Sequence, residues 1–185
     1  WKKQSVAHSS GGGLDYEAGI SISVAGRSDT DSCNRMEPEG EIHAVMQLCH
    51  GMVEFIDRYD AFAKYLNEHG IYVVGHDHLG HGKSVQNEEY HGYFHKTNGN
   101  EYVIGDIHKL REMTQKKYPD KPYFMLGHSM GSFLIRQYME MYGPGLSGVI
   151  VMGTGAQPGA ALFFGKLLCK VIAAFKGDDY RSAFV

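Results

Sequence analysis

Long hydrophobic runs, clustered basic residues and paired cysteines are all missing from this sequence of 185 residues. No window holds the ~18 consecutive apolar residues that a membrane-spanning helix needs, and the start, Trp1-Lys2-Lys3-Gln4, lacks the apolar stretch of a signal peptide. The 18 Lys and Arg residues are scattered among 21 Asp and Glu residues, for a formal net charge of -3. These absences argue against a membrane span and a nucleic-acid partner, and they predict a cytoplasmic protein.

The three cysteines, Cys33, Cys49 and Cys169, lie far apart, are odd in number and match no zinc or redox spacing. Reduced thiols in a cytosol fit this pattern best. Cys49 lies in an apolar run, which favours a small buried hydrophobic residue over a reactive thiol. The sequence begins with a residue other than Met and breaks off after Phe184-Val185 without a cap or a polar tail, so we expect a fragment of a longer protein.

The composition is that of an ordinary globular protein, with 43% hydrophobic and 21% charged residues. A chain of this length suffices for one domain with a core and is short for two. Residues 1–40 are rich in Ser, Gly and Asp and show only a weak strand pattern near Ile20 to Val24. Regular patterning begins at Glu41, and we expect a core over residues 41–156 followed by a distinct segment over residues 157–185.

Four short apolar runs alternate with three amphipathic stretches from residue 44 onward. Strands are predicted over residues 44–49, 71–74, 123–126 and 148–152. Helical spacing joins the apolar residues of the intervening stretches, namely Tyr59, Phe62, Ala63 and Leu66, then Val103, Ile107, Leu110 and Met113 or Thr114, then Phe133, Leu134, Tyr138 and Met141. This alternation predicts an α/β fold, with a mostly parallel sheet, helices on both faces and ligands at the carboxyl ends of the strands.

A Gly-x-Ser-x-Gly pentapeptide, Gly127-His128-Ser129-Met130-Gly131, joins the third predicted strand to the helix after it. In such a nucleophile elbow the glycines permit a tight turn that exposes the serine hydroxyl at the start of a helix. The backbone N–H of the next residue, Met130, then points toward the oxyanion that develops during attack on a carbonyl. This context predicts Ser129 as a nucleophile.

A tetrahedral intermediate needs a second hydrogen-bond donor, which this kind of fold supplies from the loop after an earlier strand. His50-Gly51-Met52 stands at that place, directly after the first buried strand. We expect the Met52 amide to be the second donor, Gly51 to let the backbone approach the oxyanion, and His50 to hold the loop by a hydrogen bond.

These motifs together resemble the monoacylglycerol lipase and lysophospholipase branch of the α/β-hydrolases, from about Glu37 to the last residue. The segments that carry the resemblance are His50-Gly51-Met52-Val53-Glu54, Tyr59-Asp60, Asp77-His78-Leu79-Gly80-His81-Gly82-Lys83-Ser84, and residues 127–132. The resemblance implies an α/β-hydrolase fold, a serine hydrolase that cleaves carboxylic esters with one long acyl chain, a lipid ester as substrate, and no cofactor. It also implies that residues 157–185 begin a cap or lid.

The resemblance further implies that an acid and a histidine follow the nucleophile, in the order Ser, Asp, His. No histidine follows Ser129 in this sequence, and the later aspartates are Asp178 and Asp179, in the expected cap. A serine without its base is a poor nucleophile. We therefore expect this stretch alone to be inactive or nearly so, and the sheet to be truncated before its last strands.

Other interpretations remain open beside this one. His76, His78 and His81 resemble a zinc-hydrolase histidine cluster, although Gly80 stands where the cluster needs an aspartate. A non-catalytic binding protein of the same fold is a second alternative. The apolar helical face over residues 162–175, flanked by lysines, is expected to pack on another part of the protein, with transient contact to a membrane surface as the alternative. The sequence makes no statement about the oligomeric state.

Overall fold

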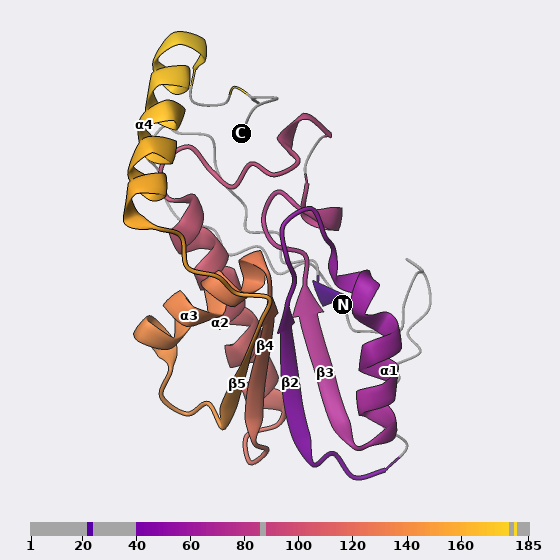
Figure 1. Ribbon diagram of the computed structural model, residues 1–185. Coiled ribbons are helices and arrows are strands. Elements are labelled where there is room, and N and C mark those ends of the chain that lie inside the picture. The colour runs from indigo at the N-terminus through magenta and orange to yellow at the C-terminus, as the bar shows by residue number, and fades with distance from the viewer. Residues whose placement is uncertain (1–21, 24–39, 86–87, 178–179, 181–185) are drawn as a thin grey trace, which may run out of the picture.

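The computed structural model describes residues 22–23, 40–85, 88–177 and 180. Five strands form one sheet in the order β1-β3-β2-β4-β5 (Figure 1). The strands from β2 onward pair in parallel, and β1 pairs antiparallel with β3. Their bounds are Ile22–Ser23 for β1, Ala44–Cys49 for β2, Ile71–His76 for β3, Tyr123–His128 for β4 and Gly148–Met152 for β5. The α/β fold with a mostly parallel sheet, predicted from sequence, is confirmed.

Three helices connect the parallel strands: α1 (Asp60–Glu68), α2 (Gly99–Lys117) and α3 (Met130–Tyr142). The same connections contain the 3-10 turns η1 (Ile56–Tyr59), η2 (Gly82–Ser84) and η3 (Glu88–Tyr90). The helix α4 (Gly159–Lys176) follows β5. None of the described helices is long and apolar enough to cross a bilayer.

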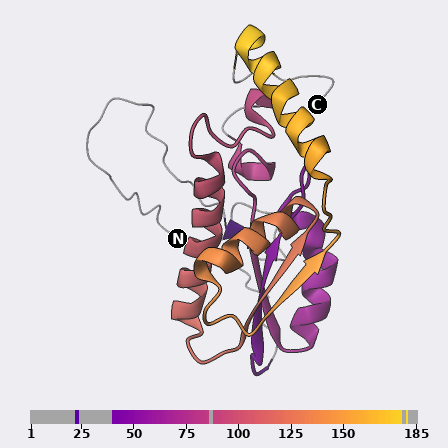
Figure 2. The ribbon, with the colours of Figure 1, turned by 60° about the vertical axis from the view of Figure 1, so that its left-hand side comes forward.

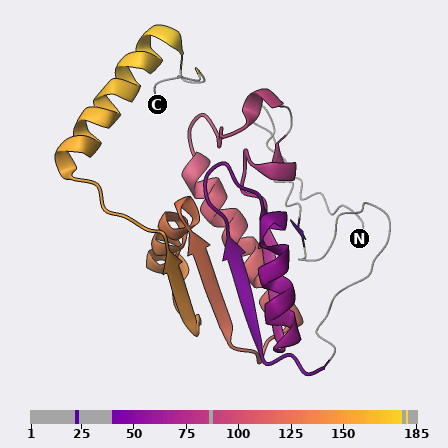
Figure 3. The same cartoon turned by 45° about the vertical axis from the view of Figure 1, so that its right-hand side comes forward.

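The core lies on both faces of the sheet because successive side chains of a strand point to opposite sides. In β2, Val45 belongs to a buried cluster with residues of α2 and α3, whereas its neighbour Met46 belongs to a second cluster with Ala63 of α1. Figures 2 and 3 show α2 and α3 against one face of the sheet and α1 against the other. The three central strands, β3, β2 and β4, are therefore covered on both faces, as a parallel sheet requires.

Two details of the predicted pattern are wrong. Strands β3 and β4 continue two residues beyond the apolar runs, through Gly75-His76 and Gly127-His128. The two glycines extend the ladders with β2, whereas His76 pairs with β1 and His128 pairs with β5. The predicted apolar stripe of α3 included Phe133 and Met141, but these side chains are 48% and 50% exposed. Leu134, Ile135 and Tyr138 form the buried face instead.

The strand order brings three loops to one edge. β2 lies between β3 and β4, so the loop at His50, the loop at Asp77 and the turn at Ser129 follow the carboxyl ends of adjacent parallel strands (Figure 1). Figure 3 shows α4 standing apart from the sheet and its other helices, at the end of the extended segment that leaves β5. The convergence of the three motifs at one edge, expected from sequence, is present.

Candidate active site

Ser129 is the single residue between β4 and α3. Its backbone has φ 52° and ψ -117°, and Val53 and Ser129 are the non-glycine residues with positive φ in the described part of the chain. Neighbouring groups hold this strained turn: the Ser129 N–H donates to the carbonyl oxygen of Met152 at 3.0 Å, and the Ser129 carbonyl accepts from the amide and the hydroxyl of Ser132 at 2.9 and 2.5 Å. Backbone strain of this kind concentrates at functional sites.

The elbow glycines permit close backbone contact. A Cβ atom on Gly131 would collide with the carbonyl oxygens of Cys49 and His50, and one on Gly127 would collide with the carbonyl oxygen of Gly131. The first turn of α3 thus packs directly against the carboxyl end of β2. Any other residue at either position forces α3 away from the sheet.

The loop after β2 reaches the nucleophile. A Cβ atom on Gly51 would lie 3.1 Å from the Cβ atom of Ser129. The Gly51 amide donates to a carboxylate oxygen of Glu54 at 2.7 Å, whereas the Met52 amide donates to no described acceptor. The first amides of a helix likewise lack intrahelical acceptors, and Met130 is the first residue of α3. The structure therefore places Gly51, the residue before Met52, beside Ser129, and the roles of the Met52 and Met130 amides stay predictions.

His50 joins the loops that follow β2 and β3. Its Nδ1 lies 2.8 Å from the Gly51 carbonyl oxygen and its Nε2 accepts the His78 N–H at 2.9 Å, so the proton sits on Nδ1. The ring is fully buried, and burial lowers its pKa against the opposing effect of the Gly51 carbonyl. A neutral imidazole in a fixed tautomer holds this edge of the site.

Glu54 links the loop to the elbow, and nothing in the sequence pattern assigned it that place. Its side chain is only 9% exposed. One oxygen, Oε2, accepts from the Gly51 amide, from the Tyr59 hydroxyl at 3.0 Å and from His128 Nδ1 at 3.2 Å. Oε1 accepts from Arg58 at 3.0 Å. The only hint in the sequence is an acidic residue three positions after Gly51, where a side chain can reach back to a loop amide.

Burial raises the pKa of the Glu54 carboxyl, but the Gly51 amide, His128 and Tyr59 oppose it and leave this pKa below its ordinary value. The group is therefore ionised at neutral pH. The same carboxylate, together with burial of the phenol, raises the pKa of Tyr59 and keeps its hydroxyl protonated as a donor.

The histidine loop after β3 is organised around Asp77. Its carboxylate accepts the Ile56 amide and the Lys83 amide, each at 2.7 Å. The rings of His76 and His78 are fully buried, and none of their nitrogens has a hydrogen-bond partner in the described chain. Burial lowers the pKa of His76 to about 3 and that of His78 well below its ordinary value.

The three histidines of the zinc alternative do not converge on one point. The His76 and His78 rings lie perpendicular with centroids 5.1 Å apart, and His81 lies beside His50 and Phe94. Within the described ranges, no three His, Cys, Asp or Glu side chains are placed to hold a metal ion. The donor geometry that a zinc site at this loop requires is not formed.

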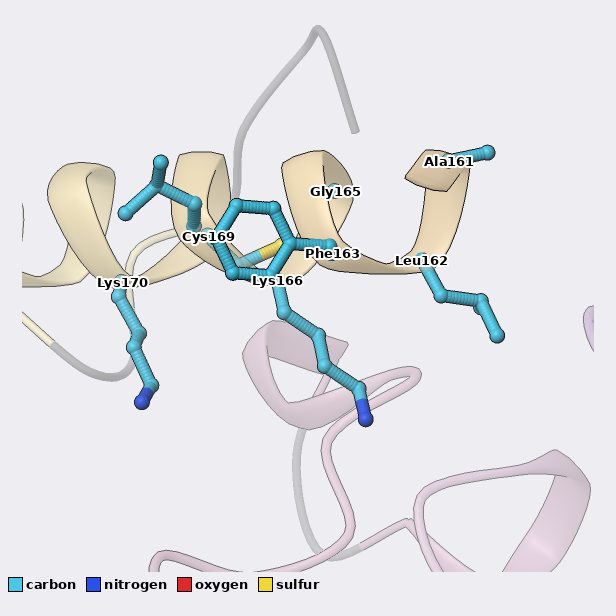
Figure 4. A pocket seen from close by; sticks show the side chains of 8 residues that line it. Ala161, Leu162, Phe163, Gly165, Lys166, Cys169 and Lys170 are labelled. Carbon is cyan, nitrogen blue, oxygen red and sulfur yellow. The ribbon is translucent and has the colours of Figure 1, made fainter. Parts of the chain in front are cut away.

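A shallow hollow on α4 lies apart from these residues. Its lining comes from α4 alone and includes Leu162, Phe163, Lys166, Cys169 and Lys170 (Figure 4). None of the residues around Ser129 contributes to it. Contact of this helix with a membrane surface stays a prediction.

Known proteins share both the sequence pattern and the fold. The family model described as serine aminopeptidase, S33, matches residues 40–178. Mouse monoglyceride lipase is 35% identical over 99 residues, which cover 54% of this chain and 31% of that protein. Monoacylglycerol lipase of Mycolicibacterium smegmatis is 29% identical over 116 residues, covering 63% of this chain and 39% of the relative.

The crystal structure of a thermostable carboxyl esterase from Bacillus coagulans in complex with glycerol superposes with a TM-score of 0.66 and 33% identity. The match covers 80% of this chain and 47% of the esterase. The chain thus spans about a third of the length of the curated relatives (31% and 39%) and about half of this structure. By the family model and the shared fold, the chain belongs to the serine aminopeptidase S33 family, in its monoacylglycerol-lipase-like branch of the α/β-hydrolases.

Proposed function

We propose that this chain carries the nucleophile and the oxyanion hole of a serine hydrolase that cleaves lipid carboxylic esters, with monoacylglycerols or lysophospholipids as substrates. The observation that carries the proposal is the strained turn at Ser129 in contact with Gly51. That contact supports a hydroxyl near two segments, of which the Met52 and Met130 amides would bind the oxyanion. The names of the matched relatives support an ester of glycerol and a fatty acid as the substrate.

The proposed reaction is acyl transfer to Ser129. Its Oγ attacks the ester carbonyl carbon, and the carbonyl oxygen becomes an oxyanion held by the Met52 and Met130 amides. The tetrahedral intermediate collapses, the C–O bond to the alcohol breaks, and the alcohol leaves with a proton. Water then cleaves the acyl-enzyme and regenerates the serine.

Proton transfer needs a base, and residues 130–185 contain no histidine. The Ser129 hydroxyl also makes no hydrogen bond to any described side chain. We therefore propose that the full-length natural protein is the active form and that the 185-residue stretch alone turns over little ester.

The test is fluorophosphonate labelling of the full-length protein, followed by peptide mapping. We expect the label on Ser129, hydrolysis of a monoacylglycerol, and loss of at least ~10³-fold of that activity in Ser129→Ala. Turnover that resists a chelator argues for this mechanism over the zinc alternative. Absence of both label and turnover would favour the non-catalytic alternative.

The family description names an aminopeptidase, so a peptide is the second substrate class to test. The same preparation should be assayed with an aminoacyl p-nitroanilide beside a monoacylglycerol and a lysophospholipid. If the anilide is cleaved faster than the esters, the proposed substrate becomes a peptide, and Ser129 remains the proposed nucleophile.

A further inference from the structure

We propose that Glu54 is a positioning residue whose carboxylate holds the two halves of the oxyanion hole in register. This inference rests on the proposed function and names a residue that acts through others in the same site. One half is the loop at Gly51-Met52, and the other is the elbow at His128-Ser129-Met130. Glu54 contacts both halves with the same oxygen.

The contact with the loop decides which amide faces the oxyanion. Because the Gly51 N–H donates to Glu54, it is not available to a substrate. The carboxylate thereby fixes the peptide plane between His50 and Gly51. His50 Nδ1 fixes the next plane, between Gly51 and Met52, through the Gly51 carbonyl oxygen. The following amide, that of Met52, then remains as the donor.

The contact with the elbow runs through the residue that precedes the nucleophile. His128 is the last residue of β4, and its Nδ1 lies 3.2 Å from Glu54 Oε2. Seventy-four positions in the sequence separate the two partners, so the contact joins segments that only the folded sheet brings together. A shift of the loop relative to the elbow has to break either this contact or the one to Gly51.

A carboxylate near a developing oxyanion is unfavourable unless its charge is compensated. Here Arg58 and His128 approach it from two sides and Tyr59 donates its hydroxyl. Its low exposure and its four donors suit a group that fixes geometry rather than one that exchanges protons with a substrate.

An amide cannot replace this carboxylate. Glu54→Gln turns one of the two carboxylate oxygens into an NH₂ group, which can only donate. At the Oε2 position that group would face three donors, and at the Oε1 position it would face Arg58. The substitution keeps the volume of the side chain and removes the shared acceptor, so it isolates the positioning role from packing.

The experiment measures the second-order rate constant of fluorophosphonate labelling in the full-length protein, together with the labelled fraction at saturation and the melting temperature. For Glu54→Gln we expect a rate constant lower by on the order of 10- to 100-fold, with the labelled fraction unchanged. With an ester substrate, kcat should fall while KM stays within about threefold, since a misplaced donor affects the transition state more than the bound ester. Loss of folded protein alone would lower the labelled fraction and leave the rate per site unchanged.

Glu112→Gln provides the matched control. Glu112 lies in the second half of α2 and also faces a histidine and a cation, His108 and Lys109, but it contacts neither the loop nor the elbow. We expect the control to label at the wild-type rate. Equal slowing in both variants, or a Glu54→Gln rate equal to or above that of the wild type, would overturn the inference.

A second variant keeps the test decisive if Glu54→Gln does not fold. His128→Leu removes the hydrogen bond between Glu54 and the elbow and leaves the other partners of Glu54 in place. The His128 side chain is one-third exposed. We expect labelling slower by about 5- to 10-fold. An unchanged rate there would overturn the inference. A wild-type protein that takes no label at Ser129 would instead refute the proposed function, and the inference with it.

Discussion

The edge of the sheet around Ser129 and the helix α4 differ in how their side chains are partnered. Around Ser129, buried polar groups such as Glu54, Asp77 and His50 each have hydrogen-bond partners from other loops. Along α4 no residue is buried, and the large apolar side chains are exposed, namely Leu162, Phe163, Phe164, Leu167, Leu168, Val171 and Phe175. The neighbouring strand β5 also exposes Ile150, Val151 and Met152.

The two regions therefore differ in how many of their side-chain contacts are made within the described chain. The contacts described for the elbow and its loop lie within residues 49–152, whereas no side chain of α4 is fully buried against the described chain. Matched substitutions in the two regions of the 185-residue chain should therefore have unequal effects on the free energy of unfolding.

The largest contrast is expected between two helical glycines. Gly131→Ala places a Cβ atom against main-chain carbonyl oxygens and should cost about 3 kcal/mol or more. Gly165→Ala meets nothing within 4 Å and should gain up to about 1 kcal/mol, because alanine favours the helix. Urea unfolding of both variants measures the difference, and equal free energies would show that α3 does not pack on β2 as described.

Core packing gives the next contrast. Ile135→Ala empties a fully buried position of α3 and should cost about 2 to 4 kcal/mol. Phe164→Ala in α4 removes a side chain that is 66% exposed, and we expect a change within about 0.5 kcal/mol. A large loss in Phe164→Ala, measured by thermal unfolding, would mean that α4 is packed in solution.

Buried Arg111 allows the same comparison for a cation. It donates to the carbonyl oxygens of Tyr142 and Pro144 at 2.7 and 2.9 Å and so ties α2 to the end of α3. Arg111→Met should cost about 2 kcal/mol, because those carbonyls lose a charged donor, whereas exposed Lys170→Met should change stability by less than about 0.5 kcal/mol. Denaturant midpoints at constant m-value distinguish the two, and similar midpoints would contradict the anchoring role of Arg111.

Acid should destabilise the folded chain, because its buried histidines bind protons more readily after unfolding. The pKa of His76 is lowered to about 3 in the fold by burial, while the unfolded chain binds the proton near the ordinary value of about 6.5. Unfolding is therefore increasingly favoured as pH falls from about 6.5 toward 3, by ~1.4 kcal/mol per pH unit for each such histidine. His76→Leu should reduce this slope by one proton. An identical slope in His76→Leu would show that this ring is not buried in its neutral form.

Much of the fold could be predicted from the sequence, because the spacing of apolar residues indicates which side chains are buried. The bounds of β2 and β5 match the apolar runs, and α2 ends at Lys117, two residues before Pro119, because a proline disfavours a helical residue before it. The stripe of α3 was misplaced because hydrophobicity alone does not distinguish Phe133 from Ile135; only packing against the sheet does. The two-residue strand β1, Ile22–Ser23, lies within the weak strand pattern predicted near Ile20 to Val24.

The candidate site was predictable where a local turn has a sequence signature. Gly127, Ser129 and Gly131 carry such a signature, and the pairing with Gly51 follows from strand order. The places of Glu54 and Asp77 were not predictable, because their partners lie up to 74 positions away and are chosen by the folded loops. The histidine-rich composition near residue 78 suggested metal ligands, whereas these side chains are buried and directed apart.

The contact between Gly131 and the carbonyl oxygens of Cys49 and His50 has a consequence for how substrate preference can change. Main chain meets main chain there, with no side chain in between. In the serine hydrolase that we propose, the spacing between the nucleophile and the oxyanion donors therefore does not depend on which residues line the substrate pockets. Mutation can change such pockets while the proposed chemistry is retained. Efforts to change the substrate specificity of this protein should therefore keep Gly131 and its contact with Cys49 and His50, and vary residues away from that contact.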